Sequence, residues 1–208
     1  MTKCCLGLMT VLATSVSLVW AEQDVLYDVK VISAYARPAG NDSVLTVRED
    51  TLKNGELASR ATGDSLEFTW QHTPSGMTLE IRNGSGQEVT LVWDSSMASA
   101  MGGQSLEILP FERGMEYTEN LRAPAKPVRS GKKYMTKIAT LARNGDGTVH
   151  FIDLLPYPQT GAPISTFEKY PEHFTTTKHF LITMAIQRNG SLKRYSFAFA
   201  AEHLGLRR

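Results

Sequence analysis

The chain has 208 residues, and its 22 lysine and arginine residues nearly balance its 21 aspartate and glutamate residues. This near-neutral charge argues against a general polyanion-binding protein, so we expect no nucleic-acid partner. The length is sufficient for one domain to bury a hydrophobic core without disulfide bonds.

The N-terminus has the pattern of a secretory signal peptide. Lys3 precedes an apolar run that ends at Trp20, and the small residue Ala21 comes before a polar flank. We therefore expect residues 1–21 to be removed and residues 22–208 to form a single domain. The alternative, a retained transmembrane anchor, is disfavoured by the hydroxyl residues within the run, so we expect no membrane span after cleavage.

Both cysteines, Cys4 and Cys5, lie inside this predicted signal peptide. The exported chain would contain no cysteine, although its compartment permits disulfides. Secreted eukaryotic domains of this length more often carry cysteines. The sequence therefore favours a bacterial protein of the periplasm or cell envelope, or one that is secreted.

Segments that alternate apolar and polar residues follow one another along the rest of the chain. In one of them, Leu66, Phe68 and Trp70 share a face. This period of two predicts half-buried antiparallel strands, and their spacing predicts an all-β sandwich or barrel. The predicted strands are residues 25–36, 43–49, 65–72, 77–83, 88–94, 105–109, 133–142, 148–155, 179–187 and 192–201.

Asn-Gly pairs at 54–55, 83–84, 144–145 and 189–190 separate several of these strands. Both residues of a type I′ turn need positive φ, which Asn and Gly tolerate best, so the pairs predict β-hairpins. No segment has a helical period longer than a turn or two, although residues 95–103 and 162–174 could each form one short helix.

Trp93 is predicted to pack in the core because it shares a strand face with Val89 and Leu91. Asp94 then falls at the strand end, where a carboxylate commonly accepts backbone N–H bonds. The alternative is that loop carboxylates act as a catalytic pair, as in glycan-acting hydrolases. Its candidate residues are Asp94, Asp146, Asp153 and Glu168.

Residues 121–137 contain six basic residues and no acidic one. The run is interpreted either as a solvated, proline-rich connection or as a local patch for an anionic surface, a polysaccharide or an acidic protein. On the second interpretation, the candidate partner-binding residues are Lys126, Arg129, Lys132 and Lys133.

A long segment, residues 154–174, is rich in proline and aromatic residues. Its aromatic rings could stack on a sugar or contact a partner protein, since loops on a rigid scaffold often carry function. They could equally cover one open end of the β-structure. The candidate residues are Tyr157, Phe167, Tyr170 and Phe174.

No motif in the chain indicates a metal, a cofactor or a catalytic nucleophile. His173 and His179 are six residues apart, which in an extended strand is roughly 20 Å, too far to share one ion. We therefore expect no cofactor and no metal site.

The stretch "LEIRNGSGQEVTLVWDSSMASAMGGQSLEILP", followed by "PAKPVRSGKKY", resembles a pattern of small exported bacterial proteins and lipoproteins of unknown function. The resemblance covers roughly residues 79–135. It implies an extracytoplasmic, immunoglobulin-like β-sandwich and carries no catalytic residue across. The chain lacks the lipid-acceptor cysteine of such lipoproteins.

Taken together, these patterns favour a non-enzymatic extracytoplasmic protein that binds an envelope protein or a glycan through loops or edge strands. The alternative is an extracytoplasmic glycan-acting hydrolase that uses loop carboxylates. The sequence leaves the oligomeric state open.

Overall fold

The computed structural model describes residues 25–37, 43–52, 56–73, 76–99, 103–111, 121–152, 154–155 and 178–206. Within these ranges the chain is built from strands and one 3₁₀ turn. No helix in this part of the chain is long and apolar enough to cross a membrane. The predicted signal peptide lies outside the described residues.

The strands occupy most of the described chain. They are β1 (Val25–Arg37), β2 (Ser43–Val44), β3 (Thr46–Thr51), β4 (Leu57–Gly63), β5 (Leu66–Thr73), β6 (Gly76–Asn83), β7 (Val89–Leu91), β8 (Met97–Ser99), β9 (Ser105–Phe111), β10 (Lys126–Val128), β11 (Lys133–Arg143), β12 (Val149–Phe151), β13 (Lys178–Arg188) and β14 (Ser191–Leu206). The 3₁₀ turn η1 (Trp93–Ser95) follows β7.

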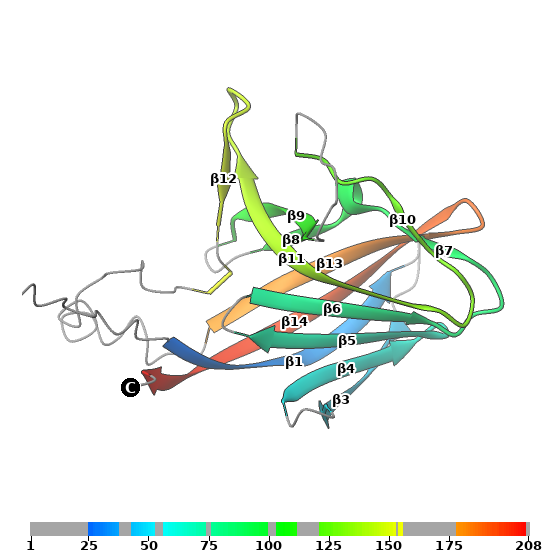
Figure 1. The fold of residues 1–208 in the computed structure, drawn as a ribbon, viewed down its shortest axis with the longest axis horizontal. Helices are drawn as coiled ribbons and strands as arrows, with labels where there is room; N and C mark the ends of the chain where they lie inside the picture. The colour runs from blue at the N-terminus through cyan, green and yellow to red at the C-terminus, as the bar shows by residue number, and fades with distance from the viewer. Residues whose placement is uncertain are drawn as a thin grey trace, which may run out of the picture.

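These strands form one antiparallel sheet with the order β2-β1-β14-β13-β8-β9-β11-β6-β5-β4-β3 (Figure 1). β7 lies between β10 and β13, and β12 pairs with the far end of β11, where the two project as an arm. The sheet curves until it is nearly closed into a barrel-like shape. The predicted antiparallel all-β architecture is therefore confirmed.

A single stretch of chain bridges the two ends of this sheet. β2 pairs with β1, β3 pairs with β4, and only the buried Leu45 separates β2 from β3. The Leu45 N–H donates to the Ala34 carbonyl at 2.9 Å. The Val31 N–H also donates to the Ser59 hydroxyl of β4 at 2.9 Å, so β1 and β4 are joined directly. These contacts bring the two ends of the curved sheet together, so that it is nearly closed.

Aromatic side chains of β5 and β14 pack against each other across the core, although the two strands are not neighbours in the sheet. Phe68 contacts Tyr195 and Phe197, and Trp70 contacts Phe197 and Phe199, with ring centroids 4.9 to 5.3 Å apart. All five rings are buried. The predicted inward face of β5 is confirmed, as is the core position of Trp93.

The alternation of apolar and polar residues predicted most strands, but it did not predict β4, β8 or β10. In β4 the inward residues are small: Ala61 lies opposite Phe68 and Ser59 opposite Trp70. Small residues beside large rings fill the interior well but leave no alternating apolar signal. The short helix predicted at 95–103 is wrong, because Met97–Ser99 form β8 between β9 and β13.

The turn predictions are likewise partly right and partly wrong. Asn189 and Gly190 have φ values of 50° and 77°, so the predicted hairpin turn between β13 and β14 is confirmed. Asp64 and Ser65, with φ values of 53° and 61°, make an equivalent turn between β4 and β5 that the sequence did not reveal. The hairpin predicted at 83–84 is wrong, since β7 pairs with β10 and β13 and not with β6, and neither Asn83 nor Gly84 has a positive φ. The pair at 54–55 lies outside the described residues.

Replacing Phe197 by alanine should lower the free energy of unfolding by about 3–5 kcal/mol, because the ring contacts both Phe68 and Trp70 and its loss leaves a cavity. Urea unfolding followed by tryptophan fluorescence measures this. Phe111→Ala removes the same ring at a position that is 64% exposed, and should change stability by about 0.5 kcal/mol or less. Equal losses in the two variants would contradict the cross-core packing.

Acid should destabilise the protein partly through His72, because burial lowers the pKa of this imidazole to about 4 from its ordinary 6.5. As the pH falls through this window, the unfolded chain binds a proton that the folded chain does not, so stability decreases. In His72→Gln, the urea midpoint should fall less than in wild type between about pH 7 and about pH 4.5. His150→Gln, in the exposed β12, is the control, and parallel pH profiles for His72→Gln and wild type would refute the assignment.

Candidate functional site

Four turns meet at one end of the folded sheet, at the right of Figure 1. They comprise residues 62–67, 82–88, 128–133 and 188–193, called the turn end below. Hydrogen bonds join them: Gly84 N–H to Ser65 O (2.8 Å), Gly131 N–H to Asn83 O (2.7 Å), Asn189 Nδ2 to Gln87 Oε1 (2.7 Å) and Arg188 Nη2 to Asp64 O (2.8 Å). Segments more than a hundred residues apart in sequence are thus fixed side by side.

The side chain of Asn83 holds two of these turns together. Its Nδ2 donates to the carbonyls of Gln87 (2.7 Å) and Val128 (2.8 Å), and its Oδ1 accepts the N–H (3.0 Å) and hydroxyl (2.6 Å) of Ser85. Asn83 is fully buried, so its bonds to Val128 and Ser85 are shielded from water, whereas the bond to Gln87 is partly exposed. An amide is suited to this position because it donates and accepts at once.

Backbone bonds extend the same framework into the basic loop. The Asn83 N–H donates to the Lys132 carbonyl at 2.9 Å, and the Lys132 N–H donates to the Arg129 carbonyl at 3.1 Å. The Ser130 hydroxyl donates to the carbonyl of Ser85. The backbone between Arg129 and Lys132 is therefore held in one conformation while its basic side chains stay exposed.

A second contact ties the β4–β5 turn to β14. Asp64 Oδ2 lies 2.5 Å from Lys193 Nζ and accepts the Tyr195 hydroxyl at 3.2 Å. Burial, reinforced by the negative charge of Asp64, raises the pKa of Tyr195, so the phenol stays protonated and donates. The carboxylate of this turn is thereby neutralised, and the turn cannot move away from β14 without breaking an ion pair.

Of the four basic residues predicted to bind a partner, the structure places three together at the turn end. Arg129 and Lys132 are exposed, and neither has an ion-pair partner among the described residues. Lys133 Nζ lies 2.9 Å from Glu80 Oε2. Lys126 is placed differently: it is half-buried, with its Nζ 4.7 Å from the centre of the Tyr134 ring, where it contacts the fold itself.

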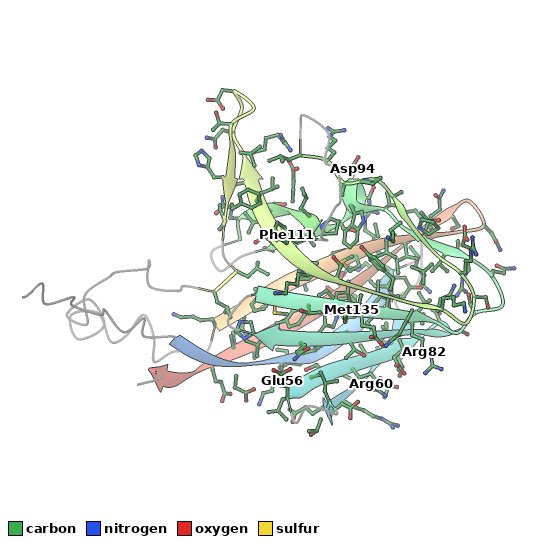
Figure 2. All side chains as sticks on the ribbon, viewed as in Figure 1. Glu56, Arg60, Arg82, Asp94, Phe111 and Met135 are labelled. Atoms are coloured by element: carbon green, nitrogen blue, oxygen red, sulfur yellow. The ribbon has the colours of Figure 1, made fainter. Side chains whose placement is uncertain are left out.

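Arg82 is an exposed cation of this end that the sequence did not single out (Figure 2). It lies in a cross-strand row between Glu67 of β5 and Lys133 of β11. Glu67 faces Arg60 at 3.9 Å and Lys133 faces Glu80, so Arg82 has no ion pair within the described chain. The residue occupies an ordinary polar position of an alternating strand, which gives no sequence signal.

An open hollow of about 460 Å³ lies beside Arg82. Its position follows from the closeness of the β4–β5 turn to the end of β6. It combines a guanidinium, a carboxylate and two hydroxyl groups within one depression. The lining residues are Thr62, Gly63, Ser65, Leu66, Glu67, Arg82 and Gly84.

The carboxylates considered for hydrolysis lie in separate turns. Asp94 is exposed in η1 and lies 3.9 Å from Arg122. The N–H groups of Ser95 and Ser96 donate to the Val92 and Trp93 carbonyls, and not to the Asp94 carboxylate. Asp146 accepts the Thr148 N–H at 2.9 Å, which lowers its pKa.

The remaining carboxylates of that set, Asp153 and Glu168, lie outside the described residues. So do the aromatic candidates, which stay predictions: Tyr157, Phe167, Tyr170 and Phe174. Within the residues that are described, no three His, Cys, Asp or Glu side chains are grouped so that they could hold a metal ion.

Large apolar side chains are also exposed, on the outer faces of β9 and β11. Phe111 and Met135 are 64% and 63% exposed, and Phe111 lies opposite Lys137, two residues from Met135 (Figure 2). Exposed apolar patches commonly mark contact surfaces. Nothing in the described chain indicates what would cover this one, so we assign it no ligand.

Asn83→Asp should destabilise the protein by roughly 3 kcal/mol, because a carboxylate cannot donate to the Gln87 and Val128 carbonyls and would be buried against them. Urea unfolding measures the loss, and hydrogen exchange of the Gly131 and Lys132 amides should accelerate. Asn144→Asp, the same change in an exposed turn, should cost about 0.5 kcal/mol or less. Similar stabilities for the two variants would show that Asn83 does not hold the loops.

No protein-family model matches this chain, and no curated protein or solved structure is significantly similar to it. The chemistry of the turn end must therefore be inferred from its own residues.

Proposed function

We propose that this chain is a non-enzymatic extracytoplasmic binding protein that holds an anionic partner at the turn end. The observation that carries the proposal is that Arg82, Arg129 and Lys132 are exposed on a hydrogen-bonded framework and have no ion pair within the described chain. Export, as the N-terminal pattern predicts, is part of the proposal.

Preorganisation supports this function. A flexible loop loses conformational entropy when it binds, whereas a loop already held by Asn83 loses little. Each cation then offers its charge at a fixed position. Glu88 is the exposed carboxylate of the turn end that lacks an ion pair among the described residues, so the three free cations outnumber it. The resulting field is local, in keeping with the neutral chain as a whole.

The scaffold is part of the same proposal. We regard the curved sheet as an immunoglobulin-like support of two packed layers, and the face-to-face packing of β5 on β14 favours this arrangement. Binding through its terminal loops is the common use of such a support. Hydrolysis by loop carboxylates is less favoured, because Asp94 and Asp146 each have a local partner in different turns.

The charge-reversed variant Arg129→Glu/Lys132→Glu tests the proposal. Polygalacturonate, a carboxylated polysaccharide, is immobilised, and binding of the purified protein is measured at increasing salt. Reversal of two charges should weaken binding by about tenfold or more, since roughly 1.4 kcal/mol corresponds to tenfold. Wild-type binding should also weaken as salt rises, because salt screens exposed charges.

The matched control is Arg48→Glu/Arg194→Glu, which reverses two exposed cations on β3 and β14, outside the four turns. It has the same net charge as the test variant and should bind like wild type. If both variants lose affinity equally, net charge and not the turn end governs binding. If neither does, the proposed site is wrong.

A further inference from the structure

We infer that the hollow beside Arg82 is a subsite for one acidic sugar, a pyranose that carries a carboxylate, such as a uronic acid residue of a glycan. The inference rests on the proposed function, and it specifies the anionic partner of that function as an acidic glycan. It is drawn from the charges, the hydroxyl groups and the rigid wall of the hollow.

The guanidinium of Arg82 is available to a ligand. Its cross-strand neighbour Glu67 faces Arg60 at 3.9 Å, and its other neighbour, Lys133, is paired with Glu80 at 2.9 Å. Arg82 therefore lines the hollow without a partner of its own in the described chain. A guanidinium matches the geometry of a carboxylate, because it can donate two parallel hydrogen bonds to the two oxygens.

The other polar groups of the hollow favour a hydroxylated ligand over a bare polyanion. Thr62 and Ser65 contribute hydroxyl groups, which both donate and accept, and Glu67 contributes an acceptor. Sugar hydroxyls need this mixture. The negative charge of Glu67 would oppose a second anionic group next to the first, so a phosphate chain or a run of acidic residues fits less well.

The wall of the hollow is rigid. Ser65 is held at φ 61°, and its carbonyl accepts the Gly84 N–H at 2.8 Å. A β-carbon at Gly84 would lie 3.1 Å from the Ser65 oxygen, so the close approach of these turns favours glycine there. Behind them, Asp64 is fixed by Lys193 and Tyr195. The Ser65 hydroxyl is therefore carried on a backbone that does not need to order on binding.

The size of the hollow, and its connection to the loop that carries Arg129 and Lys132, agree with a sugar within a longer glycan. About 460 Å³ is at the lower end of the range of small-ligand sites, enough for a ring or two and open to solvent at the side. Arg82 is followed by Asn83, which bonds the loop that carries Arg129 and Lys132. An acidic glycan seated by one residue at Arg82 would present its next carboxylates toward that loop.

Titration calorimetry with digalacturonate tests the inference. Arg82→Gln should weaken binding at least tenfold, whereas Arg48→Gln, which removes another exposed arginine of the outer face, should stay within about twofold of wild type. Methyl-esterified digalacturonate, which keeps the hydroxyls and loses the charge, should bind as weakly as Arg82→Gln binds the acid. Circular dichroism and thermal melting confirm that the variants are folded.

Glu67→Gln provides an independent readout. Removal of this charge should let tripolyphosphate bind more tightly than it binds wild type, because the repulsion of a second anionic group is gone. Tighter binding of tripolyphosphate to Glu67→Gln supports the placement of Glu67 in the site, and no change contradicts it. Competition by polyglutamate as effective as that by polygalacturonate would overturn the assignment to a sugar.

The two binding experiments distinguish a failure of this inference from a failure of the proposed function. If polygalacturonate binds and needs Arg129 and Lys132, but digalacturonate binding is absent or unaffected by Arg82→Gln, this inference is wrong and the proposed function stands. If polygalacturonate itself does not bind, or binds without regard to Arg129 and Lys132, both are wrong.

Discussion

The buried amide of Asn83 is the interaction on which the turn end depends. The amide donates to the carbonyl of Gln87, in the loop after β6, and to that of Val128, the last residue of β10, and it accepts two bonds from Ser85. Backbone carbonyls are costly to bury without such partners. The basic loop has a defined shape because these bonds are made within the protein.

The curved sheet, nearly closed into a barrel-like shape, supports the turn end. The stretch from β2 to β3 pairs with both ends of the sheet, and the rings of β5 and β14 fill its interior. Variation of the exposed side chains at the turns, such as Arg129 and Lys132, therefore changes the surface without changing the support.

Charge is distributed unevenly over this support. On the outer face, Arg60 contacts Asp50 at 2.5 Å, Lys133 contacts Glu80, and Arg143 forms two bonds of 3.0 Å with Glu107. Within each pair the two opposite charges neutralise each other, so these pairs produce little net electrostatic field. At the turn end the cations exceed the free carboxylates, so a nearly neutral protein still presents a local positive surface.

The sequence by itself determined the β-class, most strands and the inward face of residues such as Phe68, Trp70 and Trp93, because alternation is a local property of the strand. It also determined the turn at Asn189 and Gly190, where the two residue types alone permit positive φ. The same residue pair at Asn83 and Gly84 does not form a hairpin turn. Instead the Asn83 side chain bonds distant segments, as far along the chain as Val128. Arg82 likewise lines the hollow, between Glu67 and Lys133, only because of the register of β5, β6 and β11. Which strands pair, and in which register, is set by the packing of the whole core, and that information is absent from any short stretch of chain.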